Sequence, residues 1–92
     1  MYVVLMYDIV LDEKGAWVSS RVFKTCKKYL CHIQKSVFEG DITPAGLVKL
    51  QAELNKYIRT DRDSLIVFKS RDEKWMKKEF WGVEDDITSN FI

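Results

Sequence analysis

The sequence has few of the features that mark secreted, membrane-spanning or metal-chelating chains. It contains one histidine, one proline and two cysteines in 92 residues. No stretch approaches the ~20 consecutive apolar residues that a membrane-spanning helix needs. Asp8 interrupts the N-terminal apolar run and no basic region precedes it, so we expect no signal peptide and a cytoplasmic location. The chain also lacks internal repeats, linkers and low-complexity stretches.

The two cysteines do not form a recognisable metal or disulfide motif. Cys26 and Cys31 lie five residues apart in a segment predicted to be helical, so they point to different faces. This spacing fits neither a CxxC zinc motif nor an obvious disulfide. We therefore expect buried free thiols, as in a reducing cytoplasm.

The apolar content is sufficient for one small domain with a real core. Hydrophobic residues make up 47% of the chain, and 3 Trp, 4 Tyr and 5 Phe are among them. A domain of this size buries only somewhat over half of its unfolded surface, and dimerisation would add buried area. We expect a single domain over residues 1–92, with a core of about 1–70 and a C-terminal dimerisation extension of about 71–92.

Charges are segregated along the chain although the formal net charge is only +1. Residues 79–92 hold four acids and no base, whereas residues 14–35 hold six bases and no acid: Lys14, Arg21, Lys24, Lys27, Lys28 and Lys35. A basic region of this kind is compatible with a phosphate backbone as partner. It is equally typical of a solvated helix face, and composition leaves both interpretations open.

An unbroken apolar run between Tyr2 and Tyr7 predicts a central strand covered on at least one side by helices. Asp8 follows at the point where the strand meets solvent. A carboxylate held at a strand end is well placed to bind a metal or a polar ligand. Aspartate also commonly ends strands, and spacing alone favours this simpler interpretation.

The rest of the chain alternates between helical and strand patterns. We predict a helix over residues 17–31 with an apolar stripe opposite a basic face, after a loop broken by Gly15. A strand or two short strands follow over 32–42, where Gly40 marks a bulge or a close backbone approach. Thr43 and Pro44 start a second helix that runs to about Arg59. Strands are then predicted over 64–69 and 75–81, and residues 84–92 are apolar enough to pack.

This order predicts an α+β fold, a ferredoxin-like split βαβ sandwich with an antiparallel sheet and two helices on one face. The other face stays apolar and favours dimerisation.

Two separated stretches resemble the small CRISPR-associated protein 2 family. The first runs from Tyr2 to Ile9, and the second is QKSVFEG, from Gln34 to Gly40. Asp63-Ser64-Leu65, which opens a later strand, adds to the match. Each motif alone is weak, but together, with a helix between them, they are specific, and the resemblance covers essentially the whole chain.

The resemblance implies a homodimer whose C-terminal strand crosses to the partner. It also implies that Asp8 is a ligand of Mg²⁺, or of Mn²⁺, near the two-fold axis, and that members can cleave RNA or double-stranded DNA. The dimer would bridge integrase dimers in spacer acquisition and carry prespacer DNA on a basic surface. Arg21 matches one arginine of a family cluster early in the first helix, and the others are missing from Trp17 to Ser20.

Three functional hypotheses follow. In the first, the chain is a homodimeric adaptor that bridges the CRISPR integrase and binds DNA, possible contacts being Lys14, Arg21, Lys24, Lys27, Lys28 and Lys35. In the second, paired Asp8 carboxylates serve a magnesium-dependent endonuclease, since Mg²⁺ can be held by one or two carboxylates plus phosphate oxygens. In the third, the chain is a stand-alone ribonuclease toxin of similar fold. No convincing general base is apparent, because the only histidine, His32, precedes a strand and a structural role is expected for it.

Overall fold

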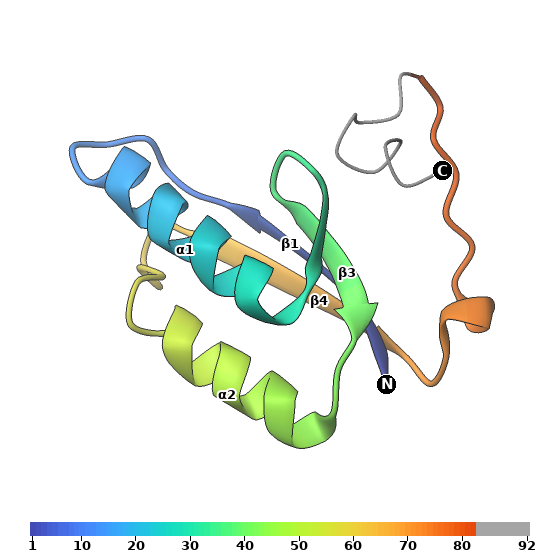
Figure 1. Ribbon diagram of the computed structural model, residues 1–92. Coiled ribbons are helices and arrows are strands. Elements are labelled where there is room, and N and C mark those ends of the chain that lie inside the picture. The colour runs from blue at the N-terminus through green and yellow to red at the C-terminus, as the bar shows by residue number, and fades with distance from the viewer. Residues whose placement is uncertain (83–92) are drawn as a thin grey trace.

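The chain alternates strands and helices around one sheet, as shown by a computed structural model that describes residues 1–82 (Figure 1). The elements are β1 (Tyr2–Asp8), α1 (Gly15–Tyr29), β2 (Cys31–Gln34), β3 (Val37–Asp41), α2 (Pro44–Leu54), β4 (Ser64–Ser70) and a 3₁₀ turn, η1 (Glu73–Trp75). The strand order is β2-β3-β1-β4 and every pair is antiparallel. The predicted α+β, ferredoxin-like architecture is therefore confirmed.

Strand β1 is central, as its unbroken apolar run predicts. It pairs with β3 from Tyr2↔Asp41 to Met6↔Val37 and with β4 from Tyr2↔Ser70 to Asp8↔Ser64. Because side chains alternate along a strand, Val3, Leu5 and Tyr7 point to the helices, whereas Val4, Met6 and Asp8 point to the other face.

The core lies between the sheet and the two helices. Helix α1 contributes Val18, Val22 and Cys26, and α2 contributes Leu50 and Leu54. They pack on the helix-facing side chains of the sheet, among which Leu5 and Phe38 are almost completely buried. This packing fixes β1 from one side only.

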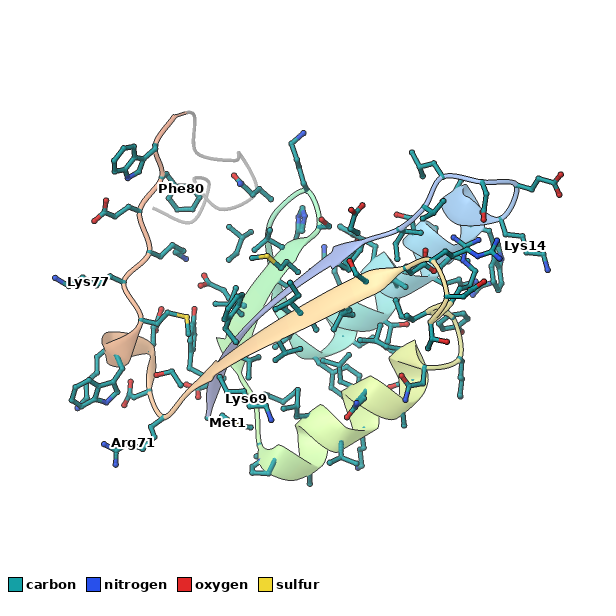
Figure 2. All side chains as sticks on the ribbon, turned by 180° about the vertical axis from the view of Figure 1, so that it is seen from behind. Met1, Lys14, Lys69, Arg71, Lys77 and Phe80 are labelled. Carbon is teal, nitrogen blue, oxygen red and sulfur yellow. The ribbon has the colours of Figure 1, made fainter. Side chains whose placement is uncertain are left out.

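No described helix covers the opposite face of the sheet (Figures 1 and 2). We call this side the uncovered face; its apolar residues are Val4, Met6, Val37, Ile66 and Phe68. Ile66 and Phe68 are each 50% exposed. Residues 76–82 run beside part of this face, leaving a cleft of about 790 Å³.

The ends of both helices differ from the prediction for physical reasons. Helix α1 covers residues 15–29 rather than 17–31, because the Asp12 carboxylate and carbonyl accept from the amides of Lys14 and Gly15 and start the turn early. Helix α2 begins after Thr43 as predicted, with the Thr43 hydroxyl accepting from the Gly46 amide at 3.0 Å. It ends at Leu54 rather than near Arg59. Directly after Leu54, backbone hydrogen bonds from residue i to residue i−3 wind the chain more tightly than an α-helix.

The segment 32–42 forms two strands joined by a tight turn, the second of the two predicted alternatives. Lys35 takes a positive φ of 42° in this turn. The bulge lies between His32 and Gln34 rather than at Gly40. Gly40 is instead a close approach, since an added Cβ would lie 3.3 Å from the Leu30 side chain. Cys31 begins β2 and is exposed, so the expectation of two buried thiols in a helix is correct only for Cys26.

Within the single chain, the prediction of a strand over residues 75–81 is wrong. This stretch contains the end of η1 and an irregular segment, and Asp72 caps η1 by accepting from the Lys74 amide at 3.2 Å. A strand needs a partner for its backbone groups, and no neighbour within residues 1–82 supplies one. The predicted packing of residues 84–92 lies outside the described residues. No described helix is long and apolar enough to cross a membrane.

Candidate functional site

Asp8 is the last residue of β1 and its side chain is exposed. It lies on the same side of the sheet as Met6, which places it at the edge of the uncovered face. Its cross-strand partner is Ser64, the first residue of β4. Within residues 1–82 the Asp8 carboxylate forms no ion pair, so it is available to an external ligand.

The neighbouring candidates for proton transfer lie on the opposite side of the sheet. Tyr7 is buried in the core with its ring centroid 6.2 Å from that of Phe38, and burial raises its pKa to about 12. The His32 ring packs against Phe23 and Phe38, with centroid distances of 4.8 and 5.0 Å, and its Nε2 lies 2.7 Å from the Lys35 carbonyl oxygen. Neither side chain can serve Asp8 as a general base, and the structural role expected of His32 is the one observed.

A buried ion pair lies next to the chain that leaves Asp8. The Asp63 side chain has no solvent exposure and accepts from Arg59 through the backbone N–H at 2.9 Å, Nε at 2.8 Å and Nη2 at 3.0 Å. Its Oδ1 also accepts from the Val10 amide at 3.0 Å. The hydrogen bonds from Arg59 hold the pKa of Asp63 down at about 2, so this carboxylate is charged at neutral pH.

Asp12 extends this cluster toward solvent. Its carboxylate accepts from Arg59 Nη1 at 2.5 Å and from Arg62 Nη1 at 3.0 Å, and these bonds lower its pKa to about 2. Arg62 also pairs with Asp61 at 2.8 Å. Both arginines are therefore occupied by carboxylates and do not form an anion site.

The predicted basic residues are all exposed, but they do not form one uniform surface. Arg21, Lys24 and Lys28 follow one another along α1 at spacings of three and four residues, which puts them on one side of the helix. Arg21 lies over the Trp17 ring at 5.4 Å, whereas Lys28 forms an ion pair with Glu53 of α2.

The other predicted contacts are separated from this row. Lys27 lies over the Phe23 ring at 5.9 Å, while Lys14 precedes α1 and Lys35 occupies the β2–β3 turn. Figure 2 shows Lys14 at the opposite end of the molecule from Arg71 and Lys77. Positive charge is thus present at both ends of the sheet.

Comparisons with known proteins identify the family. The family model described as CRISPR associated protein Cas2 matches residues 1–78. The chain belongs to this family. It is 53% identical over 92 residues to the CRISPR-associated endoribonuclease Cas2 of Fusobacterium nucleatum, covering all of this chain and 87% of that protein. The protein of the same name from Methanosarcina acetivorans is 34% identical, with complete coverage of both chains.

A solved Cas2 has the same fold. The crystal structure of Streptococcus pyogenes Cas2 at pH 6.5 matches with a TM-score of 0.80 and 29% identity, covering 89% of this chain and all of that one. The matched region of the Cas2 family model includes Asp8, α1 and the Arg59–Asp63 pair, and ends before residues 79–92.

A single chain offers few ligands for a metal ion. Within residues 1–82, no three His, Cys, Asp or Glu side chains come together in a metal-binding cluster. The exposed Asp8 carboxylate nevertheless suits Mg²⁺, which prefers oxygen ligands, retains several waters and is often held by one or two carboxylates with substrate phosphates. A site for this ion therefore fits only where a second carboxylate or a phosphate joins Asp8.

Sequence reasoning missed the residues that hold the backbone just after Asp8. In the sequence, Arg59 marks only the approximate end of a predicted helix, and Asp63 only the start of the stretch Asp63-Ser64-Leu65. The available signal was an aspartate directly before a buried strand with an arginine four residues earlier. Their connection to Val10, 49 and 53 residues away in sequence, cannot be seen from local spacing.

Proposed function

We propose that this chain is a homodimeric, nucleic-acid-binding subunit of CRISPR spacer acquisition in which Asp8 serves a magnesium-dependent endonuclease. One observation carries the proposal: the Asp8 carboxylate lies exposed at the end of a rigid central strand, on the edge of the uncovered face. The two relatives are both named CRISPR-associated endoribonuclease Cas2, which points to phosphodiester cleavage as the activity.

A second copy of the chain completes the site. The uncovered face is apolar and has no covering helix among the described residues, so packing on another copy would bury Ile66 and Phe68. A two-fold interface places the same patch against itself and thereby presents Asp8 twice at its edge. The C-terminal extension of one copy would gain a strand partner on the other. Residues 71–92 are assigned this dimerisation role.

The Asp8 pair would hold Mg²⁺, or Mn²⁺ in its place. When bound, the ion supplies positive charge at a phosphate group that is being cleaved. The contribution of the chain is to hold the carboxylates on a strand end, with the apolar interface beside them. No side chain among residues 1–82 is assigned as general base, since Tyr7 and His32 lie on the helix side of the sheet.

Nucleic acid would lie along the basic residues of α1, doubled by the dimer. Arg21 and Lys24 are the strongest candidates, because Lys28 is already paired with Glu53. Contacts of this type bind phosphates without reading sequence, so prespacer DNA and RNA are both acceptable ligands. The CRISPR integrase is the protein partner that the dimer would bridge.

Asp8→Asn tests the metal site directly, with Asp41→Asn as a matched control. Asp41 is also an exposed strand-end aspartate, but it pairs with the N-terminal amine at the other end of β1. Mg²⁺-dependent cleavage of RNA and double-stranded DNA should fall more than about 100-fold in Asp8→Asn, beyond the effect typical of outer ligands. Asp41→Asn should cleave normally, and EDTA should abolish cleavage by both this control and the unaltered chain. Cleavage that survives Asp8→Asn or EDTA removes the metal site from the proposal.

Spacer acquisition in cells separates the binding role from catalysis. If new spacers enter the array with Asp8→Asn at the normal rate, cleavage by this chain is dispensable and its role is assembly on DNA. The stand-alone toxin hypothesis predicts growth arrest when the chain is expressed without other CRISPR components. The relatives are named as CRISPR-associated proteins, which favours a role within the CRISPR system over a stand-alone toxin, and arrest under those conditions would reverse this preference.

A further inference from the structure

The backbone around Asp8 loses its strand neighbours at this position. Pairing of β1 with β3 ends at Met6↔Val37, followed by one bond from the Tyr7 amide to the Ser36 carbonyl at 3.2 Å. Pairing with β4 ends at Asp8↔Ser64. Beyond Asp8 the chain would be free to fray, as strand ends do when no further ladder bonds hold them.

Two side chains continue the support where the ladder stops. Asp63, which directly precedes β4, accepts from the Val10 amide at 3.0 Å. Arg59 Nη2 donates to the Val10 carbonyl at 2.9 Å. Both polar backbone groups of Val10, two residues after Asp8, are therefore held by one ion pair, which we call the Val10 clamp.

The two side chains of the clamp are themselves held in place by several hydrogen bonds. The Asp63 side chain is fully buried and binds Arg59 through three separate N–H groups. Arg59 is only 19% exposed, and its remaining Nη1 donates to Asp12 further along the same loop. The planar guanidinium thus spans Asp63, the Val10 carbonyl and Asp12 at once, which a lysine could not do.

Gly15 closes the loop from the other side. A Cβ added at this residue would lie 2.3 Å from the Val10 carbonyl oxygen. Only glycine lets the first turn of α1 approach the clamped peptide so closely. Three elements (the start of α1, the end of β1 and the turn before β4) meet at Val10.

We propose that Arg59 and Asp63 are positioning residues that fix the Asp8 carboxylate through Val10. This inference deepens the proposed function, on which its metal-binding consequence rests. A paired site takes one Asp8 from each copy, so any loosening of the strand end acts twice. Residues that orient ligands in this way typically change metal affinity 10- to 100-fold when they are replaced.

The first readout is independent of metal: ¹⁵N relaxation of the full, metal-free chain. The order parameters of Asp8 and Val10 should be near 0.85 in the unaltered protein, as in rigid backbone. In Arg59→Met they should fall toward 0.6 or below, while those of Val3 and Leu5 stay unchanged. Arg62→Met is the matched control, because within residues 1–82 the Arg62 side chain hydrogen-bonds only Asp12 and Asp61 and forms no bond with Val10.

The second readout is the affinity for Mn²⁺, measured by electron paramagnetic resonance of the free ion. We expect binding to be lost in Asp8→Asn, weakened about 10- to 100-fold in Arg59→Met, and within about twofold of normal in Arg62→Met. Arg59→Lys should be intermediate, since it restores the charge next to Asp63 but not the bond geometry.

A double variant keeps the test valid if Arg59→Met unfolds because it leaves Asp63 as an unpaired buried charge. Arg59→Met/Asp63→Asn removes both charges and leaves an amide oxygen for the Val10 N–H, and it should show the same two changes in weaker form. Unchanged order parameters at Asp8 and Val10 in a folded Arg59 variant overturn the positioning role. Normal Mn²⁺ binding by Asp8→Asn overturns the metal site instead, while the order parameters still decide the role of the clamp.

Discussion

At the scale of single residues, Asp63 shows how a buried charge can hold the backbone in one conformation. Taking a carboxylate and a guanidinium out of water costs about as much as their attraction returns, so such a pair adds little net stability. The Asp63 carboxylate accepts four hydrogen bonds, three from Arg59 and one from the Val10 amide. What this arrangement secures is the path of one loop, the loop that leaves Asp8.

Acid should weaken the fold through Asp63. Its pKa is about 2 in the folded chain and about 3.8 ordinarily, so its stabilising contribution is complete above pH 4 and is lost as the pH falls toward 2. The free energy of unfolding of Asp63→Asn, measured by urea denaturation, should lie below that of the unaltered chain at pH 5. The difference should shrink by about 2 kcal/mol between pH 5 and pH 2. A difference that stays constant with pH would contradict this role.

Gly15→Ala should be destabilising despite the better helix propensity of alanine. The added Cβ would lie 2.3 Å from the Val10 carbonyl oxygen, and backbone must move to relieve the contact. We expect a loss of about 1–3 kcal/mol in the free energy of unfolding, as for other overpacked sites. Gly82→Ala is the control, because nothing lies within 4 Å of its added Cβ. Equal free energies of unfolding for the two variants would show that the loop moves to accommodate the added methyl group with no loss of stability.

At the scale of elements, α1 joins the core to a row of positive charge. Its buried stripe packs on the sheet, and Arg21, Lys24 and Lys28 follow its outer side. Glu53 of α2 takes Lys28 into an ion pair and also accepts from the Tyr29 hydroxyl. The charge available for a ligand is therefore concentrated toward the first half of the row.

Lys24→Gln should weaken DNA binding equally for all sequences. Each phosphate contact contributes about one unit to the slope of log affinity against log salt concentration, so one contact per copy should be lost. Fluorescence anisotropy between 50 and 200 mM salt would measure the slope. Lys49→Gln removes an exposed lysine of α2 and should leave the slope unchanged. Equal slopes for both variants would remove α1 from the interface.

Local patterns predicted the elements but not the contacts between them. The apolar run of β1 and the pair Thr43-Pro44 act through their immediate neighbours, and both were interpreted correctly. The strand predicted over 75–81 was wrong because strand formation requires a partner, which the local sequence does not reveal. Lys28 was assigned to the open basic face, yet its charge is paired with a residue 25 positions later. Asp8 could be singled out from sequence, whereas the clamp that supports it required the fold.

At the scale of the whole molecule, the uneven covering of the sheet is the dominant feature. One face carries both helices (Figure 1), and the other has half-exposed apolar side chains, Ile66 and Phe68, on the same side of the sheet as Asp8. Glu39 accepts from the Tyr2 hydroxyl and pairs with Lys78, which ties the C-terminal segment to the edge of that second face. Burial and the hydrogen bond to Glu39 raise the pKa of Tyr2, so its hydroxyl remains a donor. A second copy packing here would meet both the apolar surface and the tethered segment.

If the proposed homodimer forms through the uncovered face, Phe68→Glu should separate it into monomers. The side chain is half exposed on the uncovered face, opposite Val4, and a charge there would be buried unpaired in each copy. An uncompensated buried charge costs about 3–5 kcal/mol, which corresponds to a rise in the dimer dissociation constant of at least about 100-fold. Sedimentation equilibrium over a range of concentrations would measure it. Val48→Glu, at an exposed apolar position on α2, should leave the dimer intact.

Because the proposed paired site needs both copies, Phe68→Glu should also weaken Mn²⁺ binding in parallel with dissociation. Tight Mn²⁺ binding by a monomeric variant would show that one Asp8 suffices.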